Sequence, residues 1–251
     1  MDKKLIILAI ASRGNSVIRH HNEELTTNPL DIYNQMIYVY WIPFIKYVEE
    51  YKKNVKIFLV FGNTDIDDLE MYIPNNVLKY DYPEKFPFIL QKTLSALNHI
   101  NNNYNYDYLL RTNLSTFFHI DNLLNIIDYN YNHNYDLLGW ELRNHALRRS
   151  FLSGTCMIYS KNMVNIIIDN QDKLEKHPFT DDLELSKLYN KPIKNLHSQI
   201  LLLEDAKEID TNKNIIINNI EKNNIFMIRI KNTNRDADVD YLTFFTNHYY
   251  N

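Results

Sequence analysis

Short apolar runs alternate with amphipathic segments along this chain of 251 residues, and the alternation predicts strands separated by helices. Unbroken apolar runs at 5–11 and 55–61 are typical of parallel strands that are covered on both faces. A shorter run at 77–80 and a run at 107–112 that turns from apolar to polar predict two more strands. The first half of the chain therefore favours a mostly parallel sheet.

Helices are expected between these runs. Asn28 and Pro29 combine an N-cap residue with proline at the first helical position, so a helix should start there and continue to about residue 53. Pro43 should kink or interrupt that helix, because proline removes a helical hydrogen bond. Further helices are expected over 84–100 and 121–129, the second with Asp121 as its cap.

The second half mixes strands and helices less regularly. Residues 141–150 are polar and basic and should form an exposed connection, and residues 210–224 should be a surface hairpin or an irregular loop. The expected strands lie at 136–140, 151–160, 193–203 and 225–230, and the expected helices at 161–170, 178–189 (with Thr180 as N-cap) and 236–250. No internal repeat or long linker divides the chain, so we predict an α/β fold in one domain, with helices flanking a mostly parallel central sheet.

Composition narrows the class of protein. Hydrophobic residues make up 45% of the chain and the net charge is −4, which indicates a packed globular protein without an overall basic field for nucleic acid. The one cysteine, Cys156, excludes an internal disulfide framework and a multi-cysteine zinc site. No apolar run approaches the length of a membrane span, and the run after Asp2 suits a core strand better than a signal peptide. We expect a cytoplasmic protein with no membrane span and no nucleic-acid partner.

Glycine positions exclude two nucleotide-binding motifs. The four glycines lie at positions 14, 62, 139 and 154. Neither the GxGxxG fingerprint nor the GxxxxGK[ST] phosphate loop can be placed on them. The common dehydrogenase and P-loop interpretations therefore fail.

Polar residues gather where the strand at 107–112 ends. Arg111, Thr112, Asn113 and Ser115 follow the apolar part of that strand. Ligands of open α/β sheets bind beyond the carboxyl ends of strands, so these side chains are candidates for a binding site. The alternative is an ordinary polar turn.

Four segments in chain order match the motifs of one family. They are Asp81 and Glu84 with the pair Lys92-Thr93, the strand DYLLRTNLSTF (107–117), the strand SGTCMIYS (153–160), and Asp181-Asp182-Leu183 at a helix start. Together they resemble the GT-A fold glycosyltransferases, in particular the fringe and β1,3-galactosyltransferase group. The resemblance implies a single GT-A-like domain with a Rossmann-like nucleotide-sugar half over 1–130. A mixed acceptor half and a C-terminal helix would occupy 131–251.

The activity implied by the resemblance is transfer of a sugar from a nucleotide-diphosphate donor, a UDP-sugar in the first place. The acceptor would be a hydroxyl of a glycan or glycoprotein. Asp182 matches the position of the family's catalytic base, with Asp181 as the rival, and the reaction would be inverting. Acidic residues in a first helical turn also occur simply because they favour the helix dipole.

Binding residues follow from the same resemblance. Trp140 could stack on a sugar face, and Gly154 could let the backbone approach donor or acceptor closely. Both residues also have structural explanations, as a buried tryptophan and a tight turn. The candidates for the donor side are Ser12, Arg13, Lys92, Arg111, Asn113, Ser115, Arg229 and Lys231.

The chain departs from the family at the acidic triplet that holds a divalent cation, Mn²⁺ or Mg²⁺. Asn113, Leu114 and Ser115 stand there, and their neutral groups are poor ligands for a hard cation. Three alternatives remain: a metal-independent enzyme, weak metal binding through Asn113 and Ser115, or a non-catalytic sugar- or nucleotide-binding protein. Arg111 favours the first alternative, because guanidinium pairs with phosphate. A nucleotidyltransferase is a further possibility.

A basic cluster after the last expected strand bears on the same question. Arg229, Lys231 and Arg235 could close over the phosphates of a donor. A solvated basic surface explains the cluster equally well.

Overall fold

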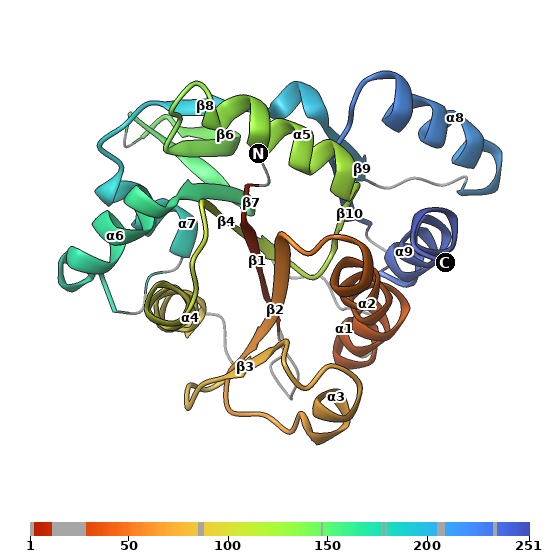
Figure 1. Cartoon of the computed structure of the whole chain (residues 1–251), viewed down its shortest axis with the longest axis horizontal. Helices are drawn as coiled ribbons and strands as arrows, with labels where there is room; N and C mark the ends of the chain where they lie inside the picture. Colours follow the sequence, from red (N-terminus) through yellow and green to blue (C-terminus); the bar gives the residue numbers. More distant parts are fainter. Residues whose placement is uncertain are drawn as a thin grey trace.

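The fold is a single α/β domain built on two sheets (Figure 1). The structure is a computed structural model, and it describes residues 3–11, 29–84, 88–146, 148–176, 178, 180–204, 209–232 and 235–251. The main sheet has the strand order β3-β2-β1-β4-β7-β6-β8. Its strands are β1 (Leu5–Ile10), β2 (Val55–Phe61), β3 (Val77–Lys79), β4 (Tyr108–Asn113), β6 (Leu137–Asn144), β7 (Arg149–Ser160) and β8 (Ile193–Asn195).

Parallel pairing dominates the main sheet, as the apolar runs predict. Strand β1 pairs in parallel with both β2 and β4, and β2 pairs in parallel with β3. Strand β7 runs antiparallel to its neighbours β4 and β6, whereas β6 and β8 are parallel. The predicted α/β class with a mostly parallel central sheet is therefore confirmed.

Side-chain alternation along β1 divides the core into two layers. Leu5, Ile7 and Ala9 pack on one face of the sheet with residues of α1 (Pro29–Met36), α2 (Ile42–Tyr51), α5 (Ile120–Tyr131) and α9 (Asp236–Tyr249). Ile6 and Leu8 face the opposite layer, where α4 (Ile89–Asn103) and α6 (Lys161–Asp169) cover the sheet. Figure 1 shows these two groups of helices on either side of β1. Burial on both faces explains why the strand reads as an unbroken apolar run.

A second, smaller sheet extends the fold beyond β4. It consists of β5 (Thr116–Phe118), β10 (Met227–Lys231) and β9 (Ile200–Glu204), with β10 in the centre. Strand β10 runs antiparallel to β5 and parallel to β9. The chain therefore passes from the main sheet at β4 into the small sheet at β5, and the turn between them carries Leu114 and Ser115.

The helix with Pro43 is interrupted as predicted, by a π-helical turn. The turn η1 (Ile37–Trp41) separates α1 from α2, and Pro43 follows in the first turn of α2. Proline has no N–H to give to a residue one turn earlier, so the register of helical hydrogen bonds changes at this place. Two buried residues of η1, Tyr40 and Trp41, form hydrogen bonds with the segment that follows β4. The Trp41 Nε1–H donates to Leu114 O at 2.9 Å, and the Tyr40 hydroxyl accepts from Phe118 N at 3.0 Å.

Two expectations for the second half were wrong. Residues 210–222 belong to the helix α8 (Ile209–Lys222), because Ile216, Ile217 and Ile220 form one buried helical face despite the many asparagines. Residues 193–203 form two strands, β8 and β9, which belong to different sheets. The short helical turn η5 (His197–Gln199) separates them.

The polar segment 141–150 also differs from its expectation as an exposed connection. Strand β6 continues to Asn144 and β7 begins at Arg149, and these two residues pair across the hairpin. Backbone hydrogen bonds hold such a hairpin whatever the polarity of its side chains.

Helix caps differ from the prediction at two places. His119 rather than Asp121 caps α5, where its ring accepts from Asn122 N at 3.3 Å. Asp121 pairs instead with Lys52. Thr180 occupies the cap position of α7 (Asp181–Leu185), but its side chain makes no capping hydrogen bond.

The remaining elements are short. The helix α3 (Asp67–Tyr72) has an acidic first turn, and η3 (Gln171–Lys173) follows α6. The turn η4 (Ser186–Leu188) continues α7. Over the described part of the chain, every helix falls short of the length and apolarity that crossing a membrane would require.

Candidate functional site

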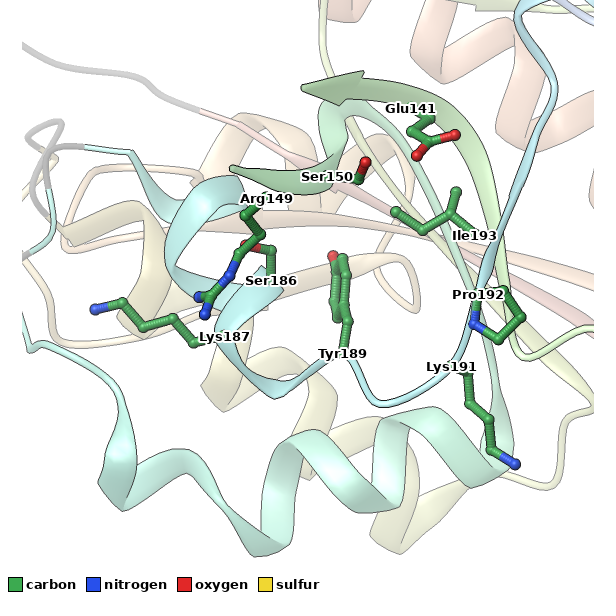
Figure 2. Close-up of a pocket in the computed structure, with 9 residues that line it drawn as sticks. All are labelled: Glu141, Arg149, Ser150, Ser186, Lys187, Tyr189, Lys191, Pro192 and Ile193. Atoms are coloured by element: carbon green, nitrogen blue, oxygen red, sulfur yellow. The ribbon is translucent and has the colours of Figure 1, made fainter. Parts of the chain in front are cut away.

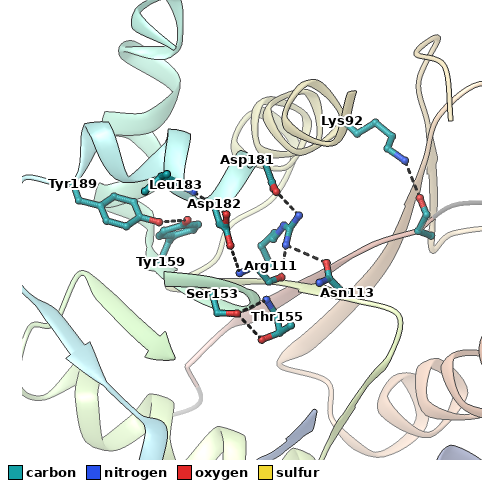
Figure 3. Close-up of polar contacts among 12 residues, drawn as sticks. Lys92, Arg111, Asn113, Ser153, Thr155, Tyr159, Asp181, Asp182, Leu183 and Tyr189 are labelled. Atoms are coloured by element: carbon teal, nitrogen blue, oxygen red, sulfur yellow. Dashed lines mark hydrogen bonds and ion pairs between the residues drawn. The ribbon is translucent and has the colours of Figure 1, made fainter. Parts of the chain in front are cut away.

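The carboxyl ends of three parallel strands meet at one edge of the main sheet. Ile10, near the end of β1, pairs with Val60 of β2 on one side and with Asn113 of β4 on the other. Ligand sites of open α/β sheets occupy this edge. Figure 3 shows the polar side chains that gather near it, from α4, β4, β7 and α7.

A buried ion pair closes the ends of β1 and β2. The Lys92 ammonium of α4 donates to Glu84 Oε2 at 2.8 Å and to Ala11 O at 2.8 Å, and Glu84 also accepts from Gly62 N. Lys92 is 1% exposed. Burial lowers the pKa of the Lys92 ammonium, and the Glu84 carboxylate opposes this shift. Both charges are thus committed to holding the strand ends, and a donor-binding role for Lys92 stays a prediction.

A second buried ion pair joins β4 to α7. Arg111 Nη2 donates to Asp181 Oδ2 at 2.7 Å, and Nη1 donates to Asn113 Oδ1 at 3.1 Å and to the Gly154 carbonyl. The Arg111 side chain is 2% exposed and the Asp181 side chain 12%. The guanidinium therefore lies beneath the surface with both terminal nitrogens occupied. This geometry favours a positioning role for Arg111 over direct contact with a diphosphate.

Asp182 lies beside this pair at the start of α7, and two backbone groups orient its carboxylate. Gly154 N donates to Oδ2 at 3.1 Å, and Leu183 N donates to Oδ1 at 2.8 Å (Figure 3). Burial raises the pKa of Asp182, and the neighbouring Asp181 carboxylate raises it further. The two backbone donors and Arg111 act in the opposite direction. A half-buried carboxylate with a raised pKa binds a proton more readily than an ordinary aspartate, which suits a general base.

Gly154 connects the two acidic residues of α7 through its own backbone. Its carbonyl accepts from Arg111, and its N–H donates to Asp182. A Cβ at this position would lie 2.5 Å from Arg111 Nη1, a distance that real Cβ contacts do not show. Glycine is therefore required here for the close approach of the guanidinium. The predicted importance of Gly154 has this physical reason, whereas its contact with an acceptor stays a prediction.

The residues at the family's metal positions do not suit a divalent cation. Asn113 Oδ1 accepts from Arg111, and both the hydroxyl and the carbonyl of Ser115 accept from Arg229 Nη1, the carbonyl at 2.9 Å. Hard cations prefer carboxylates, and here neutral oxygens already face guanidinium groups. Within the described ranges, no group of three or more His, Cys, Asp or Glu residues could hold a metal ion.

The predicted basic cluster begins within β10 rather than after it, and its described arginines are bound to the protein. Arg229 reaches Ser115, and Arg235 Nη1 lies 2.6 Å from the fully buried Asp238 carboxylate. Asn232 donates to the same carboxylate from its backbone at 3.0 Å and from its side chain at 2.8 Å. The side chain of Lys231 lies outside the described residues, as do Ser12 and Arg13.

Other predicted residues lie farther from Asp182 along the fold. Trp140 is half-buried in β6 and packs against the core, 6.1 Å from the His197 ring between centroids. Thr93 is fully buried in α4, and Asp81 accepts from Asn63 Nδ2 at 2.9 Å on the surface. Within the described ranges, none of these three residues forms a hydrogen bond or an ion pair with Arg111, Asp181 or Asp182, so their functional roles stay predictions.

Two neighbours of the site were missed in the sequence. The hydroxyls of Tyr159 in β7 and Tyr189 after η4 lie 2.7 Å apart beside Asp182 (Figure 3). Trp41 holds the turn at Leu114 from the opposite side. The chain contains 19 tyrosines, so no local pattern distinguishes these two from the rest.

Comparisons with known proteins do not identify a family. No protein-family description and no curated protein match the chain. HddC from Yersinia pseudotuberculosis is 14% identical with a TM-score of 0.45, over 77% of this chain and 89% of that chain. The 4-diphosphocytidyl-2C-methyl-D-erythritol synthase from Anaerococcus prevotii is 11% identical with a TM-score of 0.44, over 78% and 87%. A protein from Bacillus anthracis described as a glucose-1-phosphate thymidylyltransferase is 15% identical with a TM-score of 0.42, over 76% and 85%.

Likenesses at these TM-scores carry no argument about function. The resemblance to the fringe-like glycosyltransferases is not confirmed by them. Any activity must therefore be argued from the site itself.

Proposed function

We propose that this protein transfers a sugar from a nucleotide-diphosphate donor to a hydroxyl of a glycan or glycoprotein acceptor, with Asp182 as the catalytic base. The observation that carries the proposal is the Asp182 carboxylate, which two backbone N–H groups hold at a helix start with a raised pKa. It lies beside strand β4, whose carboxyl end joins those of β1 and β2. In this proposal residues 1–130 bind most of the nucleotide sugar and residues 131–251 bind the acceptor.

The proposed reaction needs one base and a stabilised leaving group. Asp182 removes the proton of the acceptor hydroxyl, and the acceptor oxygen forms a bond to the anomeric carbon of the sugar. The bond between that carbon and the diphosphate breaks on the opposite face, and the nucleoside diphosphate leaves with the electron pair. The configuration at the anomeric carbon is inverted, because attack and departure occur on opposite faces.

Guanidinium groups supply the positive charge in place of a metal ion. Arg229, in the central strand β10 of the small sheet, reaches Ser115, which is the third position of the family's acidic triplet. Arginine binds phosphate bidentately and needs no change of protonation to do so. Arg229 would therefore contact the diphosphate of a UDP-sugar, and Lys231 and the segment with Ser12 and Arg13 would complete the donor side.

Arg111 acts in this proposal through Asp182 rather than on the donor. Its guanidinium holds the carbonyl of Gly154, and the N–H of the same residue holds the base. Asp181 balances the buried charge of Arg111 at 2.7 Å. Asp181 is thus engaged in an ion pair, which favours Asp182 over Asp181 as the base.

Nucleotide binding and turnover test the proposal together. A ligand that binds only the folded protein raises its melting temperature by mass action. The full chain is heated with UDP, GDP, CMP and dTDP, each with Mn²⁺ and with EDTA, and the corresponding sugar nucleotides are then assayed for release of the free nucleotide. We expect one nucleotide to raise the melting temperature in EDTA as much as in Mn²⁺, and its sugar derivative to be turned over.

The other outcomes are equally specific. A shift that requires Mn²⁺ would refute the guanidinium assignment. Binding without turnover of any donor, alone or with acceptors, would indicate a non-catalytic binding protein. Release of pyrophosphate from a nucleoside triphosphate would indicate a nucleotidyltransferase instead.

A further inference from the structure

A cavity of about 390 Å³ opens between the β6–β7 hairpin and the segment after α7 (Figure 2). The hairpin contributes Glu141, Arg149 and Ser150 to its lining. The segment after η4 contributes Tyr189 and Lys191. The volume falls within the range of small-molecule sites, about 300–1,000 Å³.

The cavity carries cations that the protein does not neutralise by itself. Arg149 and Lys191 are exposed, and neither forms an ion pair with a carboxylate among the described residues. Lys187, a third basic residue of the lining, is paired with the buried Glu184 at 2.5 Å. In Figure 2 the Lys191 ammonium extends away from the hollow, whereas the Arg149 side chain passes Ser186 and its guanidinium lies toward Lys187, which is already paired. Arg149 is therefore the main candidate for contact with an anion.

The cavity is close to Asp182 through Tyr189. Asp182 and Ser186 are one helical turn apart, about 6 Å along the axis. The Tyr189 hydroxyl meets the Tyr159 hydroxyl at 2.7 Å, and Figure 3 shows this pair beside Asp182. Burial raises the pKa of Tyr189, and the charges of Tyr159, Asp182 and Asp181 add to the shift. Tyr189 therefore lines the cavity and also stands beside the carboxylate that the proposed reaction uses.

We infer that this cavity binds a sugar that carries an oxyanion, either a carboxylate or a phosphate group, with Arg149 as its anchor. Guanidinium forms two parallel hydrogen bonds to either group. The Glu141 carboxylate accepts hydrogen bonds only, so it suits sugar hydroxyls and not a second anion. The Tyr189 ring offers an apolar surface to the face of a pyranose.

The inference deepens the proposed function, because it assigns the cavity to an acidic residue of the acceptor. Only that acceptor role rests on the proposed function. Binding of an acidic sugar to the free protein requires no donor, no turnover and no metal, so it can be measured independently.

The test compares acidic and neutral probes on the full chain. Glucuronic acid, glucose 6-phosphate, glucose and inorganic phosphate are titrated separately, and binding is followed by protein-detected NMR at two salt concentrations. We expect both acidic sugars to bind at least about 10-fold more tightly than glucose, and more weakly at high salt because the contact is electrostatic. The two acidic sugars distinguish a carboxylate preference from a phosphate preference.

Two arginine variants locate the site. Arg149→Gln should weaken the binding of the preferred acidic sugar at least about 10-fold, since it removes the charge and the bidentate contact. Arg143→Gln is the matched control, because Arg143 is exposed on the same hairpin and does not line the cavity. Nucleotide-induced stabilisation should be the same in both variants and in the unmodified chain.

Several results would overturn the inference. One is that glucose binds as tightly as the acidic sugars, and another is that no sugar binds at all. A third is that the two arginine substitutions have equal effects. The fourth is that inorganic phosphate binds as tightly as glucose 6-phosphate. If nucleotides stabilise the chain while acidic sugars fail to bind, only this inference fails. If acidic sugars bind through Arg149 while no nucleotide binds, the proposed transferase function fails and the sugar site stands.

Discussion

Replacing Asp181 by asparagine tests whether the buried pair at α7 is structural. The substitution keeps the shape of the side chain and removes its charge, which leaves the Arg111 guanidinium buried without its counterion. Removing one partner of a buried pair costs about 3–5 kcal/mol of folding free energy. Asp181 is 12% exposed and asparagine retains an acceptor, so we expect the low end, about 3 kcal/mol.

Thermal and urea unfolding measure this loss. For a chain of this length each kcal/mol lowers the melting temperature by about 2–4 °C, so Asp181→Asn should lower it by roughly 6–12 °C. Asp128→Asn is the matched control, since Asp128 is exposed on α5 and should change stability by less than about 0.5 kcal/mol. A double variant with Arg111→Gln should lose clearly less than the sum of the two single variants, because the pair interacts directly.

Two outcomes would refute a stabilising role for this ion pair. If Asp181→Asn were no less stable than Asp128→Asn, the ion pair would contribute nothing. Additive losses in the double variant would show that Arg111 and Asp181 do not interact energetically in solution.

Four further predictions concern the base, the leaving group and Gly154. Asp182→Asn should reduce kcat by at least about 100-fold while nucleotide-induced stabilisation persists, and normal turnover would identify another base. Activity should rise as the pH passes through the raised pKa of Asp182, because only the ionised carboxylate accepts a proton. The contribution of Asp182 to stability should fall over the same pH interval, since the folded state holds this proton more tightly than the unfolded chain does. A pH profile of the rate and of the melting temperature checks both expectations. Arg229→Gln should weaken nucleotide-diphosphate binding about 10-fold in titrations that EDTA does not affect, and an unchanged affinity would leave the diphosphate without its proposed partner. Gly154→Ala should lower both stability and kcat, because the added Cβ would displace Arg111, and a variant with the original melting temperature and rate would contradict the tight contact.

The parallel strands of the core could be predicted because a strand that is buried on both faces has apolar residues at successive positions. Strands β1 and β2 read as continuous apolar runs, and their predicted bounds match the observed ones to within one residue. The interruption near Pro43 was also predictable, since proline removes a helical donor wherever it stands. These signals are local, and they do not depend on which elements pack together.

Elements whose identity depends on tertiary packing were predicted poorly. Helix α8 is rich in asparagine, and three isoleucines on one face of its described part pack against the core. The tip of the β6–β7 hairpin is polar because it extends away from the core, so its pairing leaves no hydrophobic pattern. His119 caps α5 although Asp121 is the commoner capping type, because the helix begins at Ile120 and places its cap two residues before Asp121.

The candidate site was predictable residue by residue but not contact by contact. Asp181, Asp182, Gly154 and Arg111 could each be chosen from a motif, and the structure brings all four together. Arg111 could be chosen as a partner for a diphosphate, but its contact with an acidic residue 70 positions away could not be predicted. Long-range pairs of this kind have no signal in a single sequence.

Gly154 shows why the stability and the chemistry of this site are coupled. Both backbone groups of Gly154 form hydrogen bonds at the site. Its carbonyl accepts from the buried guanidinium of Arg111, and its N–H donates to the carboxylate of Asp182. A substitution that displaces the Arg111 guanidinium should therefore also displace the Asp182 carboxylate, even if the substituted residue contacts neither group. Asp181→Asn should for this reason lower activity through the geometry at Gly154, whereas Asp182→Asn should lower activity with little loss of stability, and the contrast between these two neighbouring carboxylates separates the residue that positions from the residue that reacts.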